Sequence, residues 1–480
     1  MNYVFYDFET TGINQRFDQP IQISAMLVDE KFNIVEGKDG KKEQINETCK
    51  LRDGVIPHPK ALMVTRVNLD ELVNNQSFYE MMKKIRDKFK KWSPATFIGY
   101  NSIFFDEEVL RNSLFQSLYN PYLTNTNSNT RADLYKIMLA LMPLKNDIVK
   151  VPRNPETNKP IYKLEALAKE NNIAHEKAHD AESDVYATIG LAKQIQNNFP
   201  SFWDECLESR GPKILMEYLK TDNYFFNAPS YPSSNKYNPI TLLASNPNNI
   251  KELAFFDMEY DIDEYIDFRT SKIISTMSGK EKIIKTHKAN KCPIILSAGF
   301  MKTIDKYKDE YFEELQIKYE KIKSSDNFIE NVKQALVDRS EEYMINQSVP
   351  EHVEDQMYLG FATRENQNMM DMFNNGATGD EKYKISSQFS DTRLKEISQR
   401  IIYSEYPDKL PDSDKKERKR LIAEKVFSQE DKVSWCTIEK AKDEIDSIKA
   451  DPNYINDKEY ILKIENFIKS EEMKYKSYSS

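Results

Sequence analysis

The sequence lacks a long uncharged apolar run, and none of its stretches reaches the roughly 18 residues that a membrane-spanning helix requires. Glycine is scarce, with 12 residues among 480, and neither a G-x-G-x-x-G loop nor a Walker-type loop is present. The four cysteines include no C-x-x-C pair. The chain enters an apolar strand at once, so we expect no signal peptide. These features exclude a membrane span, a Walker-type motor and a cysteine zinc site, and they predict a cytoplasmic protein.

The charge balance is acidic, with 68 Lys and Arg against 77 Asp and Glu and a formal net charge of −9. Net charge does not decide binding, because a ligand responds to the local potential. Three basic clusters offer a positive surface for nucleic acid, although solvated helix faces often look the same: 83–91, 145–153 and 415–420.

The hydrophobic pattern changes twice along a chain that is too long for one ordinary core. The first part alternates strand and helix signals, which is typical of an α/β layer fold. Its strands are expected near 3–7, 20–29 and 95–100, and its helices near 78–92, 106–118, 132–142, 163–171 and 181–197. Short β-like runs interrupted by proline follow over 223–300, and amphipathic helical stripes after about 350.

Two carboxylates end the first apolar strand, Val4-Phe5-Tyr6-Asp7-Phe8-Glu9, directly before a turn. Alternate residues of a strand point to one face, so Asp7 and Glu9 project side by side. Two acids on one face repel each other unless a cation lies between them. Hard oxygen ligands of this kind favour Mg²⁺ or Mn²⁺ over zinc.

Two later segments supply further acids with a similar setting. Asp106 follows an apolar strand and a turn and begins a helical pattern, a position that an ordinary first-turn acid also occupies. Asp184 lies beside the apolar stripe of the helix near 181–197, where an unpaired acid costs free energy. His179 precedes it by five residues and is expected within reach of whatever Asp184 binds.

These residues together resemble the signature of the DEDD exonucleases of the histidine subtype. Further segments resemble the bacterial exonuclease I family in particular: 99–112, 119–122, 163–167 and 179–189, and more loosely 290–294 and 356–361. The resemblance implies an α/β fold that begins with an RNase H-like DEDD exonuclease domain at 1–197. It also implies an SH3-like β-containing domain at 198–350 and a C-terminal helical domain at 351–480.

The resemblance implies a 3′→5′ exodeoxyribonuclease that degrades single-stranded DNA processively to 5′-mononucleotides, with a role in DNA repair and recombination. Asp7, Glu9, Asp106 and Asp184 would hold two Mg²⁺ ions, for which Mn²⁺ can substitute, and His179 would be the general base. The expected substrate contacts are Thr10, Thr11, Gly12, Leu62, Met63, Thr65, Asn101, Arg131 and Lys163. The family also implies a bacterial-type cytoplasmic monomer that does not bind membranes, and an acidic C-terminal tail of single-stranded-DNA-binding protein as partner.

Other functions fit parts of the pattern. The motifs alone suit an exoribonuclease or a proofreading nuclease equally well. The segment from His175 to His179 formally matches H-E-x-x-H, the zinc-peptidase motif, but Asn171-Asn172 upstream disfavours the helix that this motif needs. A scaffold that had lost catalysis would normally lack one of the acids or the histidine, and none is missing.

Overall fold

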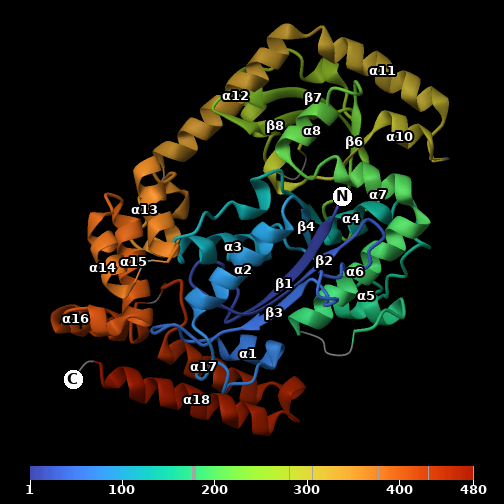
Figure 1. Ribbon diagram of the computed structural model, residues 1–480. Helices are drawn as coiled ribbons and strands as arrows, with labels where there is room; N and C mark the ends of the chain where they lie inside the picture. Colours follow the sequence, from blue (N-terminus) through green and yellow to red (C-terminus); the bar gives the residue numbers. More distant parts are fainter. Residues whose placement is uncertain are drawn as a thin grey trace.

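The structure is a computed structural model, and it describes residues 1–175, 180–279, 282–304, 306–346, 348–376, 378–430 and 432–478. Three regions follow one another along the chain (Figure 1). A mixed sheet with helices on both faces comes first, an antiparallel sheet with its own helices second, and a group of helices last. Among the described residues, no helix is both long enough and apolar enough to cross a membrane.

The first sheet has the strand order β3-β2-β1-β4-β5, with β1 at its centre. Strand β1 pairs antiparallel with β2 and parallel with β4, and β4 pairs parallel with β5. The expected strands near 3–7, 20–29 and 95–100 are present, and two short polar strands join them. The strands are β1 Tyr3–Thr10, β2 Pro20–Val28, β3 Gln44–Thr48, β4 Thr96–Gly99 and β5 Thr130–Asp133.

Strict alternation along β1 gives the sheet two buried faces. Tyr3 and Phe5 join the core beneath α4 and α6, while Val4, Tyr6 and Phe8 join the core beneath α2 and α3. A sheet covered on both faces is the layer pattern that the sequence predicted. The helices of this region are α1 Pro59–Thr65, α2 Phe78–Trp92, α3 Asp106–Phe115, α4 Leu134–Leu141, α5 Leu164–Glu170 and α6 Ala181–Asn198.

The second region is built on an antiparallel sheet of order β10-β6-β7-β8-β9, where the β-containing domain was expected. Helix α12 runs from this sheet down toward α13 (Figure 1). The strands are β6 Phe225–Asn227, β7 Asn238–Asn246, β8 Asn249–Asp257, β9 Ile284–Lys288 and β10 Ile295–Ser297. The helices are α7 Pro200–Leu207, α8 Pro212–Tyr218, α9 Thr270–Thr276, α10 Ala298–Lys302, α11 Asp309–Lys323 and α12 Asp326–Ile345.

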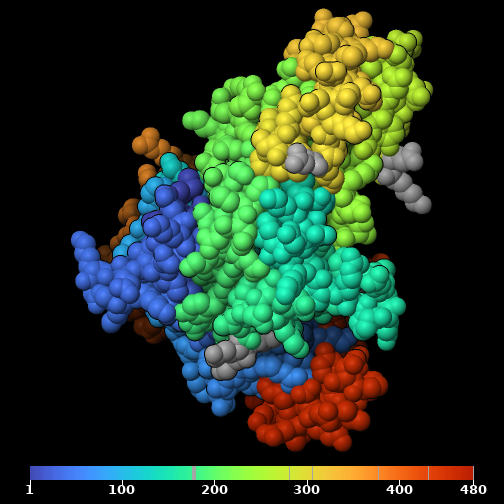
Figure 2. Space-filling model, turned by 90° about the vertical axis from the view of Figure 1, so that its right-hand side faces the viewer, coloured from blue at the N-terminus to red at the C-terminus, as the bar shows by residue number. Residues whose placement is uncertain are grey.

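The C-terminal helices pack back onto the first region. Helices α13–α15 share a core with Tyr79 and Phe115, and α16–α18 share a second core with α1. In Figure 2 the red C-terminal segment lies directly beneath the blue surface of the first region. The helices are α13 Arg364–Asn374, α14 Gly379–Gln388, α15 Thr392–Glu405, α16 Asp412–Val426, α17 Ile438–Ala450 and α18 Lys458–Lys476.

Candidate active site

Strand β1 positions the first two carboxylates. Its parallel pairing with β4 extends only to Phe5, so Asp7 and Glu9 lie beyond the end of the paired segment. Both remain paired with β2, opposite Ser24 and Gln22, which fixes their backbone. Because they continue the face of Tyr3 and Phe5, they point toward α6.

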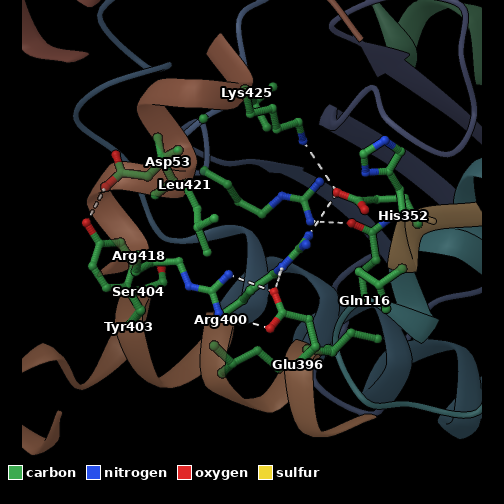
Figure 3. A pocket seen from close by; sticks show the side chains of 18 of the residues that line it. Asp53, Gln116, His352, Glu396, Arg400, Tyr403, Ser404, Arg418, Leu421 and Lys425 are labelled. Carbon is green, nitrogen blue, oxygen red and sulfur yellow. Dashed lines mark hydrogen bonds and ion pairs between the residues drawn. The ribbon is translucent and has the colours of Figure 1, made fainter. Parts of the chain in front are cut away.

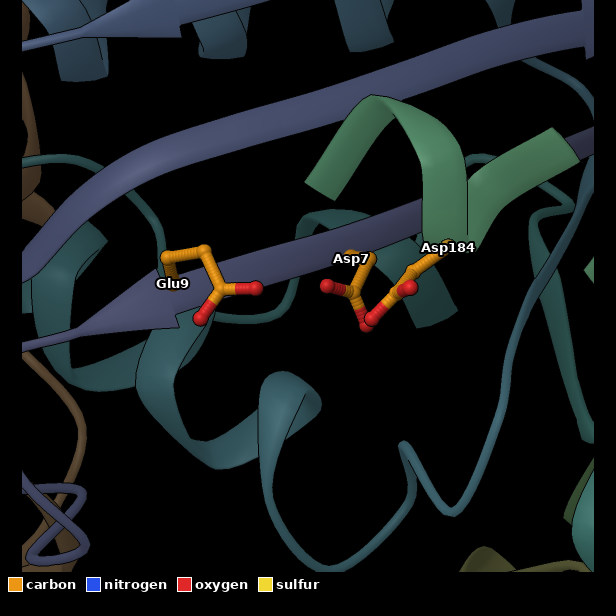
Figure 4. A group of neighbouring side chains, drawn as sticks. All are labelled: Asp7, Glu9 and Asp184. Atoms are coloured by element: carbon orange, nitrogen blue, oxygen red, sulfur yellow. The ribbon is translucent and has the colours of Figure 1, made fainter. Parts of the chain in front are cut away.

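Helix α6 brings the third carboxylate to the same face. The Asp180 side chain caps the helix by accepting hydrogen bonds from the backbone amides of Glu182 and Ser183. Val185, the residue after Asp184, packs on the face of the sheet that carries Tyr3 and Phe5. Asp184 in the first turn therefore meets Asp7 and Glu9, and one carboxylate oxygen from each of the three lies within 4.8 Å of the others. Figure 4 shows Asp7 and Asp184 pointing toward one another, with Glu9 further along the strand.

Asp106 reaches this group from the other side of β1. It is the first residue of α3, and its Oδ1 accepts a hydrogen bond of 3.2 Å from the backbone amide of Phe8. Only 5% of Asp106 is exposed. The structure thus places it at the amide between Asp7 and Glu9, at the border of the three-carboxylate group.

The electrostatics of these acids are unfavourable without a cation. Burial raises the pKa of Asp7 well above its usual range, and Asp106, Glu9 and Asp184 add to the shift. Burial, with Asp184 and Asp106, raises the pKa of Glu9 to about 9, and burial raises the pKa of Asp106 to about 7. Among the described residues, no Lys or Arg forms an ion pair with Asp7, Glu9 or Asp106. Divalent cations held by carboxylate oxygens would remove this repulsion.

Comparison with known proteins identifies this arrangement. A family model described as an exonuclease, RNase_T, matches residues 4–192. The exodeoxyribonuclease I of Buchnera aphidicola subsp. Schizaphis graminum is 31% identical over 431 residues, which are 87% of this chain and 86% of that protein. The chain belongs to the exodeoxyribonuclease I family. The Escherichia coli K12 exodeoxyribonuclease I is 28% identical over 321 residues, covering 63% of this chain and 65% of its own.

Solved structures of this family share the fold over the full chain. A moderately thermophilic exonuclease I from Methylocaldum szegediense matches with a TM-score of 0.80 at 20% identity, and the match covers 100% of both chains. Escherichia coli exonuclease I in complex with a dA16 oligonucleotide matches with a TM-score of 0.79 at 20% identity over 99% of both. The α/β exonuclease domain, followed by a β-containing region and a helical end, is therefore confirmed. Membership of the exodeoxyribonuclease I family also implies the use of divalent metal ions by the acidic group.

The two histidines before α6 have different outcomes. His179, the predicted general base, lies outside the described residues, as does Glu176. His175 is described, and its Nε2 lies 2.5 Å from Oδ1 of Asp184 with only 5% of its side chain exposed. It follows the end of α5 and is not helical, so the described start of the H-E-x-x-H segment lacks the helix that a zinc peptidase requires. The sequence alone indicated no function for His175 apart from its place in that motif.

The turn after β1 is tightly held. Thr10 Oγ1 donates to the carbonyl of Gly12, and Thr11, fully buried, donates its amide to the Gln19 carbonyl. A Cβ on Gly12 would lie 2.4 Å from Asp18 Oδ2 and 2.5 Å from His58 Cδ2, so a larger residue there would require these side chains to move. The Thr11 carbonyl accepts from the His58 amide, so both backbone groups of Thr11 are occupied within the protein.

Three predicted substrate contacts are interior residues in the structure. Leu62 and Met63 on α1 are 0% and 2% exposed and pack against α17 and α18. Arg131 is 2% exposed, ion-pairs with Glu107 at 2.9 Å and donates to the Asn290 carbonyl of the second region. All three are therefore buried within the protein, and their predicted contacts with substrate remain predictions.

Three further predicted contacts, Asn101, Lys163 and Thr65, are at least partly exposed. Asn101 is exposed after β4 with a left-handed backbone (φ 58°), and its amide donates to Asp133. Lys163 is exposed at the start of α5. Thr65 is half-buried at the end of α1, and its Oγ1 has no hydrogen-bond partner among the described residues. Their predicted contacts with substrate remain predictions.

Proposed function

We propose that this protein is a 3′→5′ exonuclease that hydrolyses single-stranded DNA to 5′-mononucleotides with two Mg²⁺ ions, for which Mn²⁺ can substitute. The observation that supports it best is the convergence of Asp7, Glu9 and Asp184 within 4.8 Å in a member of the exodeoxyribonuclease I family. These partly buried acids, with the raised pKa values of Asp7 and Glu9, are a suitable ligand set for divalent cations.

The roles of the acids follow from their positions. Asp7, Glu9 and Asp184 would hold one ion, and Asp7 would share a second with Asp106. Ions bound there would activate the attacking water and stabilise the leaving 3′ oxygen. Because Asp106 is anchored by the Phe8 amide, its carboxylate is held in place before substrate arrives. His179 would accept the proton of the attacking water, a role suited to a near-neutral imidazole.

His175 adds a positioning role. Its ring nitrogen at 2.5 Å from Asp184 would orient that carboxylate toward Asp7 and Glu9. Groups that hydrogen-bond a metal-binding carboxylate commonly restrict its orientation in this way.

Partners and organisation follow from the family. A solved structure of Escherichia coli exonuclease I in complex with a dA16 oligonucleotide, and a solved structure of SSB/exonuclease I in complex with the inhibitor CFAM, support the same two partners here. We further propose that the chain acts processively as a cytoplasmic monomer in DNA repair, with domains at 1–197, 198–350 and 351–480.

A single gel experiment tests the function. The purified chain with Mg²⁺ is given 5′-labelled single-stranded DNA, duplex DNA and single-stranded RNA of one sequence. We expect the labelled DNA strand to shorten from its 3′ end while duplex and RNA stay intact. Faster shortening of RNA would instead assign the chain to RNA trimming, and intact strands of all three kinds would refute the nuclease.

A further inference from the structure

A large cavity lies between the exonuclease domain and the C-terminal helices, away from the acidic group. Its volume is about 990 Å³, and it is lined by the loop after β3, by α2, by residues 351–356 and by α15 and α16. None of the four predicted metal ligands lines it. Binding sites for small ligands commonly have this size and lie at such joints between domains.

Four cations from three separate elements line one part of this cavity, which we call its floor: Arg52, Arg400, Arg418 and Lys425. The last three are labelled in Figure 3. Arg400 on α15 pairs with Glu354 and with Glu396, both at 2.8 Å. Arg418 on α16 pairs with Glu396 at 2.7 Å, and Lys425 lies 3.4 Å from Glu354. Two carboxylates therefore serve three of the cations, which leaves the floor with positive charge in excess.

Arg52 is the fourth cation, and it is the least compensated. Its guanidinium donates to two neutral amide oxygens, Gln116 Oε1 at 2.5 Å and Gln19 Oε1 at 3.3 Å, and stacks over Phe78 at 4.3 Å. No carboxylate among the described residues lies within ion-pair distance of it. Burial lowers the pKa of Arg52 to about 10, which reflects the cost of holding this charge without an anion.

The remainder of the lining is slightly acidic, with four Lys and Arg side chains and five carboxylates. Over the described residues, the whole cavity carries eight Lys and Arg side chains and seven carboxylates. The rim acid Asp53 is paired with Lys474, a residue outside the lining. The excess positive charge is thus local to the floor, where the planar guanidinium groups suit the oxygens of a phosphate.

We propose that this cavity binds a small phosphate monoester, namely the 5′-mononucleotide released by the proposed reaction. The phosphate would lie among Arg52, Arg400 and Arg418, and the nucleoside would fill space that a bare phosphate leaves empty. Aromatic side chains at the wall, Trp435 and Tyr403, suit a nucleobase. The choice of ligand rests on the proposed function, whereas the phosphate-binding floor does not.

Because the lining comes from both regions, a bound nucleotide would hold the C-terminal helices against the exonuclease domain. Binding should therefore raise the midpoint of thermal unfolding as well as appear in calorimetry.

Calorimetric titration of the full chain in chelator tests the site, because chelator prevents metal-dependent binding at the acidic group. The titrants are dAMP, deoxyadenosine, inorganic phosphate and a single-stranded oligonucleotide. We expect dAMP to bind more tightly than phosphate and deoxyadenosine not to bind. Arg52→Gln and Arg418→Gln should each weaken the affinity for dAMP roughly tenfold or more, as loss of a charge-assisted hydrogen bond does.

Two further variants keep the test decisive. Arg420→Gln is the matched control, since Arg420 is on the same helix, half exposed and outside the lining, and it should leave binding unchanged. Leu421→Trp fills the cavity without removing any charge and should block dAMP even if an arginine variant fails to fold.

Three results would overturn the proposal. These are no binding of dAMP to the wild-type chain, equal binding by Leu421→Trp and wild type, or binding by the oligonucleotide alone. Nuclease activity is measured separately. Binding of dAMP without nuclease activity would refute only the proposed function. Nuclease activity without dAMP binding would refute only the nucleotide site in the cavity.

Discussion

Asp106 and Glu107 are neighbours in the chain, and the protein treats their charges in opposite ways. Glu107 is fully buried and forms ion pairs of 2.9 Å with both Arg111 and Arg131. Asp106 begins α3 and lies near Asp7 and Glu9, and it forms no ion pair with a Lys or Arg of the described residues. Removing a carboxylate from water costs free energy at both positions. Arginine offsets this cost at Glu107 but not at Asp106.

The difference separates structure from function. The Glu107 cluster is complete within the chain, because Thr124 and Tyr6 also donate hydrogen bonds to that carboxylate. Asp7, Glu9 and Asp106 form no ion pair with a Lys or Arg of the described residues, and we infer that divalent ions supply the positive charge. A substitution in the Glu107 cluster should therefore destabilise the fold, whereas a substitution in the acidic group should stop catalysis.

The largest effect is expected from Asp7→Asn. Loss of a shared metal ligand should lower the rate of 3′-nucleotide release by roughly a thousandfold or more. Stability in chelator should not fall, because the substitution relieves repulsion with Glu9 and Asp106. Rates on single-stranded DNA and urea unfolding of the same preparations measure both. The control is Glu182→Gln, an acid on α6 that accepts from Asn46 instead. A variant that retains a tenth of the wild-type rate would contradict the assignment.

Glu107→Gln should have the reverse profile. It leaves Arg111 and Arg131 buried with too little negative charge and should destabilise the fold by about 3–5 kcal/mol. Urea unfolding followed by circular dichroism measures the change. Glu108→Gln is the comparison, since Glu108 is partly exposed and should cost less. An equal loss of unfolding free energy in the two variants would show that the buried ion pairs of Glu107 contribute no more to stability than the partly exposed ones of Glu108.

His175→Ala should have an intermediate effect. Removing the ring that lies 2.5 Å from Asp184 should lower activity roughly 10–100-fold by releasing that carboxylate, with the fold preserved. Activity across a range of Mg²⁺ concentrations measures it, and an increased metal requirement is the expected sign. A wild-type metal response would remove His175 from the account.

The smallest expected effect is at His58, where a titratable cation compensates the charge of nearby acids. His58 Nδ1 lies 2.7 Å from Glu444 Oε1, and its Nε2 lies 4.0 Å from Asp18 Oδ1; Lys440 and Lys60 are also near. The hydrogen bond to Glu444 raises the pKa of His58 despite burial. This stabilisation is complete below the ordinary histidine pKa and disappears as the pH rises through the raised value.

Glu444→Gln checks the sign of that dependence. The variant should lose stability, on the order of 1 kcal/mol, at pH 6 and much less at pH 9. Urea unfolding of both proteins at the two pH values measures the difference. A loss that grows with pH would mean that the His58 charge does not contribute.

The fold and the acids were predictable because their signals are local. The alternation of β1 and the stripe of α6 put Asp7, Glu9 and Asp184 on facing surfaces without any knowledge of distant residues. Strands β3 and β5 were missed, since they have only five and four residues and carry polar side chains.

The burial of Leu62, Met63 and Arg131 depends on residues far away in the sequence. Leu62 and Met63 resemble an open apolar surface until α17 and α18, which lie far along the chain, cover them. Arg131 resembles a phosphate-binding residue until the fold brings Glu107 against it. The cavity beside Arg52 likewise exists only where the C-terminal helices return to the exonuclease domain.

The most direct test of the central claim is a count of bound metal. Metal-free protein is titrated with Mn²⁺, and the free ion is followed by electron paramagnetic resonance. We expect two bound ions for the wild-type chain and for any folded Glu107→Gln protein, and the loss of at least one in Asp7→Asn. Wild-type protein that binds no Mn²⁺, or an Asp7→Asn variant that binds both ions as well as wild type, would contradict it.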